Sequence, residues 1–182
     1  ERSFRERLAA GTGDAASALA IQRLFDGTDD DAARVTLFRD SAAWCPYCEK
    51  CWLFLEMKRI PYTVSKVNMN CYGDKPGWFW AMQPSGGIPV AKVDGRVITE
   101  SNEILMALER TFTSRPMLPA DSSAQHERVT PLLQLERQLF SVWFRWLTSS
   151  QSDGAHRYNF QSLMAEVDRE LAGGGGPYFL GG

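Results

Sequence analysis

The hydrophobic positions of this 182-residue chain change their spacing near residue 34 and again near residue 113. Between these points, short apolar or alternating runs typical of strands alternate with runs of period 3.6 that are typical of helices. The strand-like segments are 35–39, 62–67, 90–93 and 96–98, and the helix-like segments are 46–59, a short aromatic stretch at 78–80, and 100–112. The order β-α-β-(α)-β-β-α predicts an α/β domain over 34–113, whose mixed four-stranded sheet has parallel and antiparallel pairs.

Residues 1–33 are interpreted as an N-terminal arm. Asp14 is placed to cap a helix that runs to Phe25. An arm docked loosely on the following domain is the alternative that we favour. The segment lacks the features of a secretory signal, and it is too acidic for a transit peptide still in place. Earlier removal of a transit peptide is an alternative that the sequence leaves open.

Beyond residue 113 the pattern predicts helices alone. Residues 114–120 contain two prolines and are interpreted as a linker to an all-α region at 121–182. Asp121 or Ser122 is expected to cap its first helix, in which Pro131 either introduces a kink or marks the true start.

This first helix carries an apolar stripe, and a second helix with a matching stripe is expected at 158–171. The stripe of the first helix includes three aromatic residues, which are tempting as a substrate pocket: Trp143, Phe144 and Trp146. Aromatic residues at helical spacing more often form a hydrophobic core, and we expect a core here.

Composition narrows the function classes. A hydrophobic content of 44% and a charged content of 23% are typical of a globular protein with a sizeable core. The net charge of −2 provides no broad basic face for nucleic acid or an anionic membrane. No apolar stretch approaches the roughly 18 residues that span a bilayer. Four cysteines, three of them in one helical stretch, favour a reducing intracellular compartment over a secreted disulfide framework.

Cys45 and Cys48 form a Cys-x-x-Cys pair where the first strand gives way to the first helix. Pro46 suits the first helical position, because the N–H that it lacks has no partner there in any helix. The other free N–H groups and the helix dipole stabilise a thiolate, which can lower a cysteine pKa to about 3.5–7.5. Cys48 lies one turn later, where it can resolve a mixed disulfide. Cys51 continues the apolar stripe, and we expect it to pack in the interior.

A metal site is the alternative for these thiols. Cys45, Cys48, Cys51 and Cys71 are four potential thiolate ligands. Three of them follow one another at i+3 steps on one helix, whereas tetrahedral zinc sites more often use cysteines from turns. Neither histidine of the chain lies at metal-ligand spacing to them. We therefore expect no metal.

Three elements in this order resemble a known family. They are Cys45-Pro46-Tyr47-Cys48, Gly87-Ile88-Pro89-Val90, and Glu100-Ser101 at the start of a helix. Together they resemble the glutathione-binding, thioredoxin-like N-terminal domain of cysteine-type (omega-like) glutathione S-transferases and, more distantly, glutaredoxins. Residues 68–76 resemble the iota-type transferase-like proteins of photosynthetic organisms.

The resemblance implies the chemistry of the cysteines and the loop near them. Cys45 is the expected nucleophile, and Cys48 adds a dithiol route. Pro89 is similar to the family's cis-proline, which turns the backbone of Ile88 toward the cysteinyl part of glutathione. Pro46 and Tyr47 are included in this glutathione-binding set.

The resemblance also implies contacts for the two ends of glutathione. Glu100 suits the α-ammonium and Ser101 the α-carboxylate of its γ-glutamyl end. A plain helix start is the alternative for this pair. Lys75 matches a lysine near the glycyl carboxylate, and a solvated loop charge is its alternative.

The implied function is that of a glutathione-dependent thiol transferase or oxidoreductase. Its expected reactions are thiol–disulfide exchange, deglutathionylation or reduction of a small oxidised substrate such as dehydroascorbate. Glutathione is the expected co-substrate, and the expected compartment is the chloroplast, after removal of a transit peptide, or the cytoplasm.

The resemblance weakens at the C-terminal end. Residues 177–182 resemble the stretch before the central helix of the family's helical domain, so 121–182 is expected to be an incomplete version of it. A protein partner or a second copy is then expected to cover the two helices. The alternative function is a transferase-derived, non-catalytic binding or structural subunit of a larger assembly, with a plastid as its expected compartment.

Overall fold

The computed structural model describes residues 19–25, 33–149 and 154–181. The chain divides into two compact units, Glu1–Met117 and Leu118–Gly182, which are treated separately below. No helix within the described ranges is long and apolar enough to cross a membrane.

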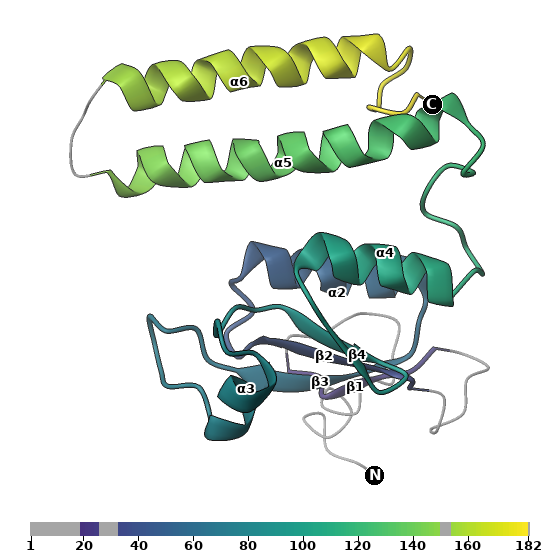
Figure 1. Cartoon of the computed structure of the whole chain (residues 1–182), viewed down its shortest axis with the longest axis vertical. Helices are drawn as coiled ribbons and strands as arrows, with labels where there is room; N and C mark the ends of the chain where they lie inside the picture. Colours follow the sequence, from purple (N-terminus) through teal and green to yellow (C-terminus); the bar gives the residue numbers. More distant parts are fainter. Residues whose placement is uncertain (1–18, 26–32, 150–153, 182) are drawn as a thin grey trace. The chain divides into compact units, whose positions relative to one another are not determined.

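The first unit is built on a mixed sheet (Figure 1). Its strand order is β1-β3-β2-β4-β5. The strands are β1 (Gln22–Arg23), β2 (Val35–Asp40), β3 (Tyr62–Val67), β4 (Val90–Val93) and β5 (Arg96–Thr99). β2 and β3 are parallel, and the other neighbouring pairs are antiparallel. The predicted mixed sheet is confirmed, but within the described residues it has five strands rather than four, because the N-terminal arm contributes β1.

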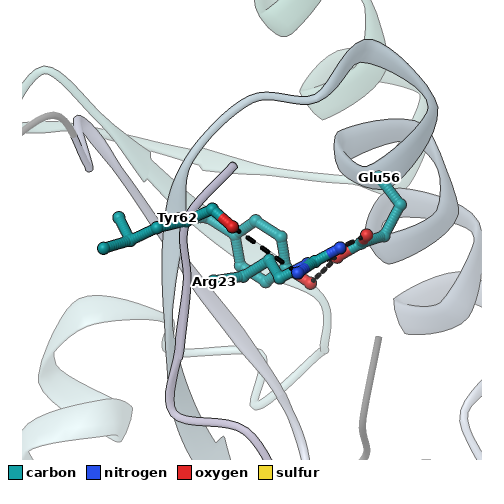
Figure 2. Close-up of polar contacts among 4 residues, drawn as sticks. Arg23, Glu56 and Tyr62 are labelled. Carbon is teal, nitrogen blue, oxygen red and sulfur yellow. Dashed lines mark hydrogen bonds and ion pairs between the residues drawn. The ribbon is translucent and has the colours of Figure 1, made fainter. Parts of the chain in front are cut away.

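β1 also corrects the predicted helix that ends at Phe25, as far as residues 19–25 are concerned; residues 14–18 lie outside the described residues. Arg23 pairs with Tyr62 of β3 in the antiparallel register. Its Nε lies 3.2 Å from both carboxylate oxygens of Glu56, and the Tyr62 hydroxyl donates to Glu56 Oε1 at 2.7 Å (Figure 2). An ion pair and a sheet edge therefore hold this segment extended, and they outweigh its helix propensity.

We expect Arg23→Met to lower the free energy of unfolding by about 1–3 kcal/mol, because the substitution removes hydrogen bonds to a charged, mostly buried carboxylate. The Arg23 and Glu56 side chains are 7% and 17% exposed. Urea unfolding measures the change. Arg34→Met is the matched control, since the Arg34–Asp94 pair is exposed and should contribute little. Equal effects of the two substitutions would contradict the prediction.

The helices of the first unit are α2 (Pro46–Lys58), α3 (Gly77–Met82) and α4 (Ser101–Thr111). α2 and α4 cover one face of the sheet, and α3 lies at the other (Figure 1). Because side chains alternate along a strand, β2 supplies both faces. The larger core cluster contains Val35 and Leu37 with residues of α2 and α4, and the smaller one contains Phe38 with Phe79 of α3.

The helix ends differ from the predicted ones by one residue. Arg59 has a left-handed backbone with φ 55°, so it caps α2 rather than extending it. Glu100 also has a positive φ, of 66°, and it is the N-cap of α4 rather than its first residue. The predicted Asp94-Gly95 hairpin joins β4 to β5, and both residues have positive φ.

The second unit contains α5 (Ala124–Thr148) and α6 (Gly154–Gly173), which lie side by side (Figure 1). Neither Asp121 nor Ser122 caps α5: Ser123 does, accepting from the N–H of His126 at 3.1 Å. The helix starts before Pro131 and continues through it, so this proline does not mark the true start. Buried Val129 and Leu135 flank the proline, and their packing holds the helix together across it.

The aromatic residues of α5 do not form the expected core. Trp143, Phe144 and Trp146 are 40%, 50% and 38% exposed. Their ring contacts are with each other, with Phe140 and with Phe160 of α6. Two helices alone offer no third layer that would cover this face.

Candidate functional site

Cys45 lies at the N-cap of α2, where the sequence predicts it. Its Sγ accepts from the backbone N–H of Cys48 at 3.3 Å and lies 3.9 Å from the carbonyl oxygen of Ile88. A hydrogen bond with the Cys48 thiol, and then the N–H groups of Cys48 and Tyr47, lower the pKa of Cys45 to about 7 against the opposing effects of burial and Asp40. A large fraction of Cys45 is therefore thiolate at neutral pH.

The other two cysteines of α2 are poor nucleophiles. Cys48 is 1% exposed, and its pKa is raised, first by the hydrogen bond that its thiol donates to Cys45 and then by burial. Burial raises the pKa of Cys51 to about 12, and its thiol faces the carbonyl oxygen of Ser101 at 3.7 Å. Cys45 is thus the thiol of this helix that the surroundings activate, and Cys51 packs in the interior as expected.

The loop before β4 lies against the thiol. The Ile88–Pro89 peptide bond is cis. Pro89 is buried and Ile88 is half-buried, with the carbonyl group of Ile88 at Cys45. Pro46 is exposed at the first position of α2, and Tyr47 is half-buried beside it. The structure therefore brings all four together with Cys45.

Glu100 and Ser101 stand at the start of α4, and contacts to α2 hold this end of the helix. The Cys51 thiol meets the Ser101 carbonyl group, and Lys50 Nζ donates to Asn102 Oδ1 at 2.6 Å. Glu100 is exposed. Ser101 is 1% exposed, and within the described part of the chain its hydroxyl has no hydrogen-bond partner. An unsatisfied buried hydroxyl at a helix start suits an anionic ligand group.

Lys75 is not a solvated loop charge. The residue is 8% exposed, its Nζ donates to Asn70 Oδ1, and the ammonium lies 6.0 Å from the centre of the Trp80 ring. These contacts hold the lysine within the loop that leads to α3. Whether it also contacts glutathione stays a proposal.

Sequence reasoning missed Asp40. This last residue of β2 is fully buried, and its Oδ2 accepts from the Trp44 N–H at 2.6 Å and from the Tyr72 hydroxyl at 3.1 Å. Its carboxylate raises the pKa of both Cys45 and Cys48. A charged residue at a strand end is usually solvated, so only its position five residues before Cys45 could have drawn attention to it.

Across residues 19–25, 33–149 and 154–181, no group of three or more His, Cys, Asp or Glu side chains is arranged to hold a metal ion. The Cys48 thiol is hydrogen-bonded to Cys45, whereas the Cys51 thiol faces the carbonyl oxygen of Ser101.

The fold and the site together define a class of protein: an α/β domain with an activated thiol at a helix start, facing a cis-proline loop. Residues 44–111 match the family model of the glutathione S-transferase N-terminal domain. Over these residues the chain is therefore similar to the N-terminal domain of glutathione S-transferases.

Individual relatives agree with this assignment. The chain is 30% identical over 120 residues to glutathione S-transferase DHAR3, chloroplastic, of Arabidopsis thaliana, covering 65% of this chain and 42% of that relative. It is 30% identical over 148 residues to pyrimidodiazepine synthase of Drosophila melanogaster, covering 78% and 56%. The crystal structure of glutathione transferase Omega 3C from Trametes versicolor has a similar fold, with a TM-score of 0.70 at 24% identity over 81% of this chain and 62% of that chain. The chain thus spans about half the length of the two curated relatives.

Proposed function

We propose that this chain catalyses glutathione-dependent thiol–disulfide exchange, with Cys45 as the nucleophile. The observation that carries the proposal is the Cys45 thiol at the start of α2, with a pKa of about 7 and the Ile88 carbonyl group beside it. The names of relatives, which contain glutathione S-transferase, support the role of glutathione as co-substrate.

In the first step, the Cys45 thiolate attacks one sulfur of a disulfide substrate. A Cys45–sulfur bond forms, the substrate S–S bond breaks, and the other sulfur leaves as a thiolate that takes a proton from water. In the second step, either a glutathione thiolate or Cys48 attacks the mixed disulfide. The first route releases Cys45 and forms a glutathione disulfide, and the second forms a Cys45–Cys48 disulfide that two glutathione molecules later reduce.

The surrounding residues are proposed to hold glutathione beside Cys45. The backbone of Ile88 pairs with its cysteinyl part, and Ser101 offers its unsatisfied hydroxyl to the α-carboxylate. Glu100, exposed at the start of α4, receives the α-ammonium. Lys75 attracts the glycyl carboxylate after giving up its bond to Asn70.

The acceptor is proposed to be a disulfide or a small oxidised molecule. Two relatives carry names that point to different reactions: reduction of dehydroascorbate for a Chlamydomonas reinhardtii structure and synthesis of a pyrimidodiazepine for the Drosophila protein. Because the thiol chemistry is common to such acceptors, the proposal concerns the class of reaction. The chloroplast and the cytosol, where two plant relatives are placed by name, are the proposed compartments.

The test exposes the protein to oxidised glutathione and measures intact masses. We expect Cys48→Ser to carry one glutathione adduct on Cys45, and Cys45→Ser to carry none at this site. In the wild type, where Cys48 is able to attack the mixed disulfide, we expect either this adduct or a Cys45–Cys48 disulfide with released glutathione. The rate of Cys45 alkylation should rise with pH through about 7 and then level off, since a lowered pKa makes the thiolate dominant above that value. A folded Cys48→Ser protein that takes up no glutathione at Cys45 would refute the proposal.

That outcome would favour the second candidate function, a non-catalytic binding subunit. The observation in its favour is the exposed apolar face of the second unit, which contains Trp143, Phe144, Trp146 and Leu147 beside the half-buried Phe140. A face of this kind is typical of an interaction surface.

A further inference from the structure

The Trp80 side chain on α3 joins two parts of the proposed glutathione site. A Cβ atom at Gly86 would lie only 2.6 Å from Cζ3 and Cη2 of the indole, so this ring packs directly on the Gly86 backbone. The Lys75 ammonium lies 6.0 Å from the centre of the Trp80 ring. One side chain therefore lies against both the turn before cis-Pro89 and the lysine proposed for the glycyl carboxylate.

The other two aromatic residues of α3 have different surroundings. Phe79 is fully buried in the smaller core cluster. The Trp78 ring contacts Phe38 of β2 and Phe79, with ring centres 5.9 and 5.8 Å apart. Trp80 stays 41% exposed. Packing in the core thus explains Phe79 but not Trp80, whose contacts point to the neighbouring site.

Gly86 lies in the turn that leads to Ile88. Its backbone is left-handed, with φ 69°, and its N–H donates to the Gln83 carbonyl oxygen at 2.9 Å. The positive φ favours glycine, and the indole leaves no room for a side chain. Two residues later, the carbonyl oxygen of Ile88 lies 3.9 Å from Cys45 Sγ. A ring that supports this turn therefore helps to fix where the Ile88 backbone meets a ligand at Cys45.

Lys75 depends on the same ring when it changes partner. The residue is 8% exposed, and its Nζ donates to Asn70 Oδ1. In the proposed function, Lys75 gives up this bond to reach the glycyl carboxylate of glutathione. The contact with Trp80 can persist, since the attraction between a cation and a ring face needs no fixed hydrogen-bond geometry and strengthens where water is excluded. Trp80 thus holds the ammonium near the site in both states.

We propose that Trp80 is a positioning residue for glutathione, which fixes the turn that presents Ile88 and holds Lys75 toward the glycyl carboxylate. This inference rests on the proposed function, because it concerns the same glutathione site. Trp80 acts through these two residues rather than on the Cys45 thiol, whose pKa is set by groups of α2 and by Asp40. The residue should therefore change the preference for glutathione but not the ionisation of Cys45.

The test compares two disulfides in a Cys48→Ser, Cys71→Ser background, where an adduct on Cys45 is stable. Oxidised glutathione carries the glutamyl and glycyl groups, and hydroxyethyl disulfide lacks both. Intact masses give the rate of adduct formation with each disulfide, and the ratio of the two rates measures the preference for glutathione. We expect Trp80→Leu to lower this ratio by about tenfold, as for loss of a mostly desolvated cation–π contact. The pH midpoint of Cys45 alkylation should keep its value in the parent background.

Trp78→Leu is the matched control, because it removes an exposed tryptophan of the same helix whose ring contacts Phe38 and Phe79 instead. We expect its ratio to stay within about threefold of the parent ratio, as for a surface substitution away from the site. Equal falls in both variants, or a shifted pH midpoint in Trp80→Leu, would show a structural role of α3 and overturn the inference. An unchanged ratio in Trp80→Leu would overturn it too.

Trp80→Phe gives a second measurement if Trp80→Leu does not fold. Phenylalanine keeps a ring face for the Lys75 ammonium but lacks the outer ring atoms that lie on Gly86. We expect the ratio to fall by about threefold, since part of the ring contact survives. No change from the parent ratio would overturn the inference.

The parent background separates this inference from the proposed function. If it reacts equally fast with both disulfides, glutathione is not recognised, and the glutathione function and the inference are both wrong. If it prefers oxidised glutathione and Trp80→Leu keeps the whole preference, the inference alone is wrong.

Discussion

Cys45→Ser is expected to abolish glutathione-dependent reduction of a small mixed disulfide, with a fall in kcat/KM of at least about 10³-fold. The serine hydroxyl keeps the N-cap hydrogen bond from the backbone N–H of residue 48, so α2 should remain intact. It does not ionise near neutral pH, and it cannot form a disulfide. The loss should therefore be chemical and not structural, which circular dichroism and thermal unfolding can verify.

Cys48→Ser is the matched control for this prediction. Serine at position 48 is still able to donate a hydrogen bond to the Cys45 sulfur, and the backbone N–H groups that stabilise the thiolate remain. Glutathione itself then attacks the mixed disulfide, so much of the turnover should survive at high glutathione concentration. If Cys48→Ser lost as much activity as Cys45→Ser, the monothiol route would be wrong. If Cys45→Ser kept its activity, the nucleophile would be elsewhere.

Glu109→Leu is expected to lower the free energy of unfolding by about 3–5 kcal/mol, the usual result of leaving one partner of a buried ion pair alone. Lys58 on α2 has a fully buried side chain, and its Nζ lies 2.7 Å from Glu109 Oε2. The other carboxylate oxygen accepts from the Met117 N–H at 2.9 Å. Glu109 thus joins α4 both to α2 and to the segment after α4. Urea unfolding at neutral pH measures the loss.

The double variant Lys58→Met with Glu109→Leu tests the cause. With both charges removed, no ion remains buried, and packing of the two apolar side chains should restore most of the stability. A double variant as unstable as Glu109→Leu alone would mean that the Met117 contact, rather than the charge of Lys58, sets the cost.

The strands and helices of the first unit were predictable wherever local signals agree with burial. The run from Val35 has alternating faces, Pro46 suits a first helical turn, and Asp94-Gly95 suits a two-residue hairpin. The same agreement made the placement of Cys45 predictable, because a helix start activates a thiol whatever the rest of the fold is.

The features that were missed depend on contacts between distant residues. β1 has two residues, too few to show the alternating hydrophobic pattern of a strand. Its contacts with β3 and Glu56 hold it extended. Asp40 and Lys75 are charged, and their sequence neighbours do not reveal that the fold buries them. Pro131 lies inside a helix although proline disfavours helix interiors, because the packing of buried residues on both sides of it stabilises the helix.

Without β1, β3 would be an edge strand of the sheet. An edge strand with unpaired N–H and C=O groups readily pairs with another chain, and short or charged edge strands do so much less. β1 places a two-residue strand there, and its Arg23 side chain is turned inward to Glu56. The small N-terminal strand therefore protects the sheet from edge-to-edge aggregation. Its removal should lower the solubility of the protein more than it changes the reactivity of the Cys45 thiol.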